Sequence, residues 1–123
     1  MTPTPAPTPG PAAQARTAPS APIAPLAVPD PPAVVGAMLL RGEALLAIGD
    51  VSGARRFFER AAGSGNAAAA LQMGRTFDPT VLSTIGARGI TPDRDAAMAW
   101  YRHAQALGSA DAATRIATLE ATR

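Results

Sequence analysis

GARRFFERAAGSGNAAAA, residues 53–70, aligns without a gap on AAMAWYRHAQALGSADAA, residues 96–113, forty-three residues further along the chain. Each copy carries an aromatic pair, which is Phe57 and Phe58 in the first copy and Trp100 and Tyr101 in the second. In both, a glycine and then an alanine-rich run follow, and glycine suits the left-handed cap that ends a helix. The chain therefore contains an internal repeat in which one helix stops at glycine and another begins.

A second, shorter offset relates the segments that precede the aromatic helices. LLRGEAL at residues 39–45 and LQMGRTF at residues 71–77 each place a glycine three residues before a large apolar residue. A glycine inside a helix costs about 1 kcal/mol relative to alanine, so it marks a point where a neighbouring helix comes close. The positions that we assign to the repeat are Gly42, Ala54, Phe57, Phe58, Ala61, Gly74, Ala97, Trp100, Tyr101, Ala104 and Gly108.

Apolar periodicity and capping residues predict five helices. Asp50 is the expected N-cap of the second helix, and the fourth is expected to begin with Thr91 as cap and Pro92 at its first position. Asp78 and Pro79 are expected to open a short helical turn that ends at Gly86, and the apolar side chains of this insert should pack against the helix pair it joins. The five helices are expected at residues 33–48, 51–62, 67–77, 92–107 and 110–121.

The prolines divide the chain into two parts. Eleven of the thirteen lie within residues 1–32, where they fix φ, remove amide donors and keep the preceding residues out of the α region. We therefore predict a disordered Pro/Ala/Thr-rich tether over residues 1–32 and one helical domain over residues 33–123. No apolar run escapes the prolines or the charges for long enough to span a membrane, so we expect a cytoplasmic protein. A periplasmic or membrane-tethered location remains the alternative if the chain belongs to a longer protein.

The composition argues against catalysis and metal binding. The chain has no Cys and one His, whereas a metal site needs several ligands at fixed spacing, so we expect no metal, no cofactor and no enzymatic activity. Trp100, Tyr101 and His103 lie close together and could form a ligand site or a packing unit. At about 100° per residue the two aromatic residues fall on or beside the apolar stripe and His103 falls outside it. We expect the aromatic residues to pack and His103 to lie on the surface.

These positions resemble two related repeat families. In the first helix pair, Gly42, Ala54, Phe58 and Ala61 stand where the tetratricopeptide repeat has its small and large interlocking residues. The second pair resembles the Sel-one-like repeat, in the run Gly89-Ile90-Thr91-Pro92-Asp93, then Ala97, Trp100, Tyr101, Ala104 and Gly108. Arg41 departs from the pattern, which prefers Leu there, and the insert is longer than a minimal Sel-one-like turn.

The resemblance implies an all-α fold, a short α-α superhelix of two helix pairs plus a C-terminal capping helix. It also implies a non-enzymatic scaffold that binds a peptide or helix of a partner protein in a groove lined by the first helix of each pair. The resemblance places these residues in the groove: Leu39, Glu43, Leu46, Gln72 and Arg75, with Thr114 and Arg115 from the last helix.

Two other functions stay open. The chain could be the terminal part of a larger enzyme or cell-envelope protein. Alternatively, Arg55, Arg56 and Arg60 of the second helix could bind an anion or a nucleic acid. All eleven basic residues are Arg, but nine acidic residues leave a net charge of only +2. Basic and acidic residues alternate along the chain, whereas binding of a polyanion needs clustered positive charge.

Overall fold

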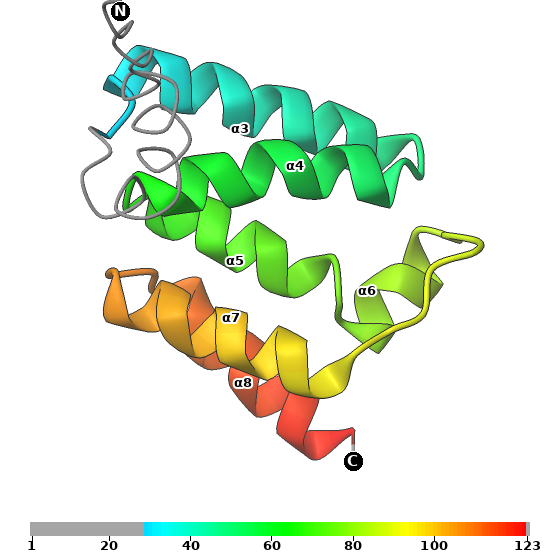
Figure 1. Ribbon diagram of the computed structural model, residues 1–123. Coiled ribbons are helices and arrows are strands. Elements are labelled where there is room, and N and C mark those ends of the chain that lie inside the picture. The colour runs from blue at the N-terminus through cyan, green and yellow to red at the C-terminus, as the bar shows by residue number, and fades with distance from the viewer. Residues whose placement is uncertain (1–28, 123) are drawn as a thin grey trace, which may run out of the picture.

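The computed structural model describes residues 29–122, and within this range the chain is all-helical, as predicted (Figure 1). The tether predicted over residues 1–32 lies outside the described residues except for its last four, and the last of these, Pro32, already belongs to a helix. The helices of the described range are α3 (Pro32–Ala47), α4 (Val51–Gly63), α5 (Ala67–Arg75), α6 (Pro79–Thr84), α7 (Arg94–Ala106) and α8 (Asp111–Ala121).

Neighbouring long helices run in opposite directions and pack in chain order. α3 packs on α4, α4 on α5, α5 on α7 and α7 on α8. Figure 1 shows the resulting stack, with the short α6 beyond the C-terminal end of α5. Leu82 of α6 is buried in the cluster that contains Leu46 and Phe58, so the insert packs against the helix pairs as expected.

Side-chain caps fix where most of the helices begin. The Asp50 carboxylate accepts from the Gly53 amide at 2.9 Å, as predicted for α4. The predicted start of the fourth helix was wrong, because α7 begins at Arg94 with Asp93 as its cap. The amide of Asp93 donates to the Phe77 carbonyl at 2.9 Å, which holds this residue in extended backbone and leaves Thr91 and Pro92 outside the helix.

Glycine ends the two aromatic helices in the same way. Gly65 after α4 and Gly108 after α7 have φ of 86° and 106°, a left-handed conformation that glycine adopts without steric cost. In each turn the amide of the following residue reaches back across the last helical turn, to the carbonyl of Ala61 at 3.4 Å or of Ala104 at 2.9 Å. These bonds satisfy carbonyls that the helix end leaves unpaired.

The two helix pairs interlock through a glycine and a buried ring. A Cβ added to Gly42 of α3 would lie 2.5 Å from Cε1 of Phe58 in α4. A Cβ on Gly74 of α5 would overlap the ring of Tyr101 in α7 in the same manner. Both rings are fully buried. The close approach that the glycines predicted is therefore present, once in α3/α4 and once in α5/α7.

Candidate binding groove

The residues expected to line a groove meet along α5. A hollow of about 150 Å³ lies between α3, α5 and α6, and one of about 460 Å³ lies between α5 and α8. Both hollows are lined by Gln72 and Arg75, so they adjoin. Six of the seven expected residues line one hollow or both, and Leu39 instead packs half-buried against the core. The six are Glu43, Leu46, Gln72, Arg75, Thr114 and Arg115.

A chain of hydrogen bonds crosses the floor of this groove. The amide of Gln72 donates to the Glu43 carboxylate at 3.3 Å, and Nη1 of Arg75 donates to Oε1 of Gln72 at 2.7 Å. These contacts connect α3 to α5 and hold three long side chains in place. Nε of Arg75 is buried and finds no acceptor among the described residues. A buried N–H without a partner loses its hydration without compensation, so this atom costs folding free energy.

A buried carboxylate lies next to the groove. The hydroxyl of Tyr101 donates to Oδ2 of Asp78 at 2.6 Å, and the Thr80 amide donates to Oδ1 at 2.9 Å. Burial raises the pKa of Tyr101 far above its ordinary value, and the hydrogen bond to Asp78 adds to the rise. Arg75 and Arg115 act in the opposite direction on this pKa, because both guanidinium groups lie near enough to favour a phenolate.

The groove can recognise a ligand through charge, hydrogen bonds and apolar contact. The first hollow adds the apolar side chains of Leu46, Ala47 and Ile85 to Glu43. The second presents Arg115 and Asp111 beside Thr114. Within residues 29–122 no group of three or more His, Cys, Asp or Glu side chains is placed to hold a metal ion.

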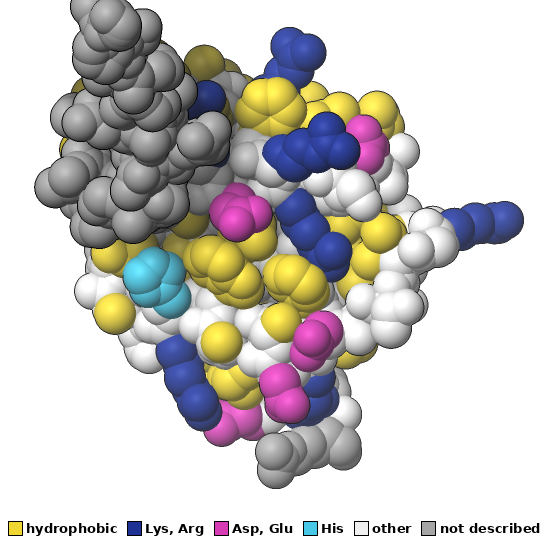
Figure 2. All heavy atoms as spheres, viewed as in Figure 1, with side chains coloured by type: hydrophobic (Ala, Val, Ile, Leu, Met, Phe, Trp, Pro, Cys, Tyr) yellow, Lys and Arg dark blue, Asp and Glu magenta, His cyan; other side chains and the backbone are white. Residues whose placement is uncertain are grey.

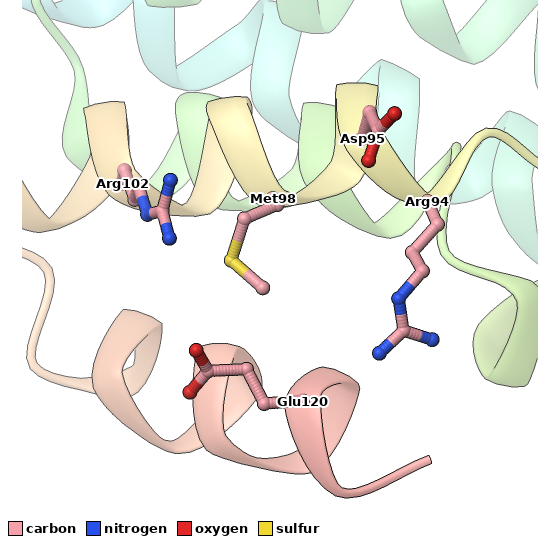
Figure 3. Close-up of a pocket in the computed structure, with 5 residues that line it drawn as sticks. All are labelled: Arg94, Asp95, Met98, Arg102 and Glu120. Carbon is pink, nitrogen blue, oxygen red and sulfur yellow. The ribbon is translucent and has the colours of Figure 1, made fainter. Parts of the chain in front are cut away.

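A third hollow, of about 290 Å³, lies between α7 and α8 (Figure 3). Arg102 of α7 and Glu120 of α8 extend into it from opposite sides, and Met98 points between them. Arg94 closes one end, where its guanidinium donates to the Leu119 carbonyl and to the Thr122 hydroxyl. Sequence reasoning missed this site, because the residues that form it are spaced as an ordinary polar helix face.

Two of the three arginines of α4 contact other parts of the protein, and Arg56 is exposed. Arg55 donates to the carbonyl of Thr76 at 2.7 Å and lies 3.9 Å from the ring centre of Phe77. Partial burial lowers the pKa of Arg55. Arg60 pairs with Asp30 at 3.2 Å. Figure 2 shows basic and acidic side chains interspersed on this side of the molecule, which is not the continuous basic surface that a polyanion needs.

The aromatic cluster of α7 divides as the helical angles predicted. Tyr101 is fully buried and Trp100 is half-buried against the core formed by α4 and α5. His103 is exposed and meets Trp100 edge to face, with 5.8 Å between the ring centres. Packing therefore accounts for the two large rings.

Searches of protein-family models, curated proteins and solved structures found no match to the chain. Among residues 29–122 no helix combines the length and the apolar character that crossing a membrane requires.

Proposed function

We propose that the protein is a non-enzymatic interaction scaffold that binds a peptide segment of a partner protein in the groove along α5. In this proposal α3/α4 and α5/α7 are two repeats of the tetratricopeptide and Sel-one-like kind, and α8 is the capping helix of a short superhelix. The repeated glycine–ring contact, Gly42 with Phe58 and Gly74 with Tyr101, supports the assignment of repeats.

The ordered floor of the groove is the observation that carries the proposal. Glu43, Gln72 and Arg75 are already held in one geometry, so these side chains lose little conformational entropy when a ligand binds to them. The hollow beside them has about 150 Å³, a size at which an apolar cavity accepts a benzene ring. We therefore expect a peptide with a large apolar side chain for this hollow and a carboxylate or carbonyl oxygen for Arg75.

Selection of random twelve-residue peptides on the immobilised full chain tests this function. Peptides that are enriched should bind in calorimetry, and Glu43→Ala combined with Arg75→Ala should weaken this binding at least tenfold. Arg56→Ala combined with Glu59→Ala makes the same change of charges on the exposed face of α4 and should leave binding intact. Equal binding by both double variants, with unchanged helical circular dichroism, would show that the groove is not the binding site.

A further inference from the structure

The outer face of α3 is almost entirely apolar. Nine side-chain positions of this helix and its C-cap are exposed, and Arg41 is the only polar one among them. Leu40 is 69% exposed and Ile48 is 77% exposed, although both are large apolar residues. At about 100° per residue eight of the nine positions form one continuous arc, with Arg41 near its edge, and Pro32 lies beyond the half-buried Glu43. In Figure 2 hydrophobic side chains gather along the upper border, where α3 lies in Figure 1.

The other long helices do not share this property. The exposed positions of α4 include Arg56, Glu59 and Arg60, and those of α7 include Asp95 and Arg102. At the opposite end of the stack, α8 exposes acidic residues and threonines between its alanines. A helical stack needs polar outer faces at its ends to stay in solution. The α8 end meets this condition, and the α3 end does not.

We infer that the outer face of α3 binds the same face of a second copy of this chain, which makes a two-fold dimer. Self-pairing matches apolar surface with apolar surface. Stacking of the α3 end on the α8 end of another copy would instead bury Asp111 or Glu120 against apolar side chains without a partner. A two-fold contact also ends at two copies, whereas end-to-end stacking leaves an unpaired end on every added copy and so continues without limit.

The geometry of the face fits a close helix pair. Its centre is formed by small residues, among them Ala37 and Ala44, which permit two helix axes to approach. Leu40 and Ile48 project from this surface and would be covered by the partner helix. Arg41 stays at the rim, where its guanidinium lies 5.8 Å from the ring centre of Phe57 and keeps access to water. A single helix pair is a small interface, so we expect a dissociation constant of roughly 10 µM.

Sedimentation equilibrium of the full chain over a hundredfold range of concentration measures this association. We expect a shift from the monomer mass of 12.4 kDa toward twice that value. Leu40→Glu combined with Ile48→Glu should weaken the association and raise the dissociation constant at least tenfold. Ala113→Glu with Ala117→Glu, on the exposed face of α8, should not change it. A monomer at every concentration, or a dimer that survives the α3 substitutions, would overturn the inference.

Cysteine cross-linking gives a second measurement that preserves the packing surface. The chain contains no Cys, so a single Ala37→Cys or Ala44→Cys variant can join two copies only at α3. At least one of them should form a disulfide-linked dimer under mild oxidation, because a residue comes within disulfide distance of its own copy only near the two-fold axis, while Ala113→Cys should form none. Absence of the α3 cross-link would contradict the two-fold pairing. If residues 23–28 were instead protected from hydrogen exchange in a monomer, that segment and not a second copy would be the occupant.

Discussion

Replacing Gly36 or Gly42 of α3 with alanine should change the free energy of unfolding in opposite directions. Gly36 faces outward, and a Cβ added there meets no atom within 4 Å. Gly36→Ala should therefore raise the free energy of unfolding by about 1 kcal/mol, the helix propensity that alanine gains over glycine. Gly42→Ala gains the same propensity, but its Cβ would lie 2.5, 2.7 and 2.9 Å from three atoms of the Phe58 ring. Overpacking of a buried site costs about 1–3 kcal/mol, and three close contacts with a ring that has no free space favour the upper end.

The expected net effect of Gly42→Ala is a loss of about 2 kcal/mol, so the two variants should differ by about 3 kcal/mol. For a domain of this size 1 kcal/mol corresponds to about 4–8 °C in Tm, which puts the difference well above experimental error. Urea unfolding followed by circular dichroism measures it, with Gly36→Ala as the matched control at low protein concentration. If Gly42→Ala is as stable as Gly36→Ala, then α3 and α4 do not meet through Phe58 and the interlocking of the helix pairs is wrong.

Three further predictions concern Tyr101, Trp100 and Asp30. Tyr101→Phe leaves a buried carboxylate oxygen of Asp78 without its donor and should cost about 1.5–3 kcal/mol in urea unfolding, whereas an unchanged stability would mean that the hydroxyl is solvated. Because the pKa of Tyr101 is raised in the folded state, the unfolded state ionises first. The contribution of Tyr101 to stability should therefore be constant below about pH 10 and then fall by about 1.4 kcal/mol per pH unit. The absorbance of this single tyrosine at 295 nm should change only as the protein unfolds. Trp100→Ala should lower the free energy of unfolding by about 1.5–3 kcal/mol, which is less than the loss for a fully buried tryptophan. His103→Ala, on the surface, should change Tm by less than about 2 °C. If His103→Ala destabilised the protein more than Trp100→Ala, a binding site on α7 would have to be considered again. The hydrogen bond from Arg60 lowers the pKa of Asp30, so this contact stabilises the folded state above the ordinary carboxyl pKa near 4 and is lost as the pH falls through the lowered pKa. Arg60→Ala should speed hydrogen exchange in the first turn of α3 at pH 7, and this effect should shrink as the pH is lowered through that range; an effect of the same size at every pH would exclude the ion pair as the cause.

Local signals in the sequence were sufficient to predict that the helices form and where most of them lie. Asp50 and the glycine after each aromatic helix act within a few residues, so their roles can be inferred without a fold. The periodicity of the aromatic pairs likewise predicted which rings are buried, since a helix of 3.6 residues per turn fixes the face that each side chain occupies. Thr91 illustrates the limit, because both Thr91 and Asp93 are good caps. The choice between them depends on the bond from the Asp93 amide to Phe77, sixteen residues away.

Contacts between distant segments could not be inferred. Asp78 and Tyr101 are twenty-three residues apart, and nothing in either neighbourhood indicates that a carboxylate and a phenol will be buried together. Arg55 has the local pattern of a solvated helix arginine, yet the turn after α5 brings Thr76 and Phe77 to it. The outer face of α3 was hidden for a different reason. This helix is apolar on nearly every side, so its sequence does not tell which side the neighbouring helices leave exposed.

The attachment of Asp30 has a mechanical consequence. Asp30 is held by Arg60 at the end of α4 and by the Ser64 hydroxyl, to which its amide donates at 3.1 Å. A force applied through residues 1–28 would first be carried by these bonds and passed to α4, and only after they rupture would it peel α3 from the stack. Arg60 is exposed to solvent and Asp30 is half-buried, so salt would partly screen the pair and lower the load at which peeling starts.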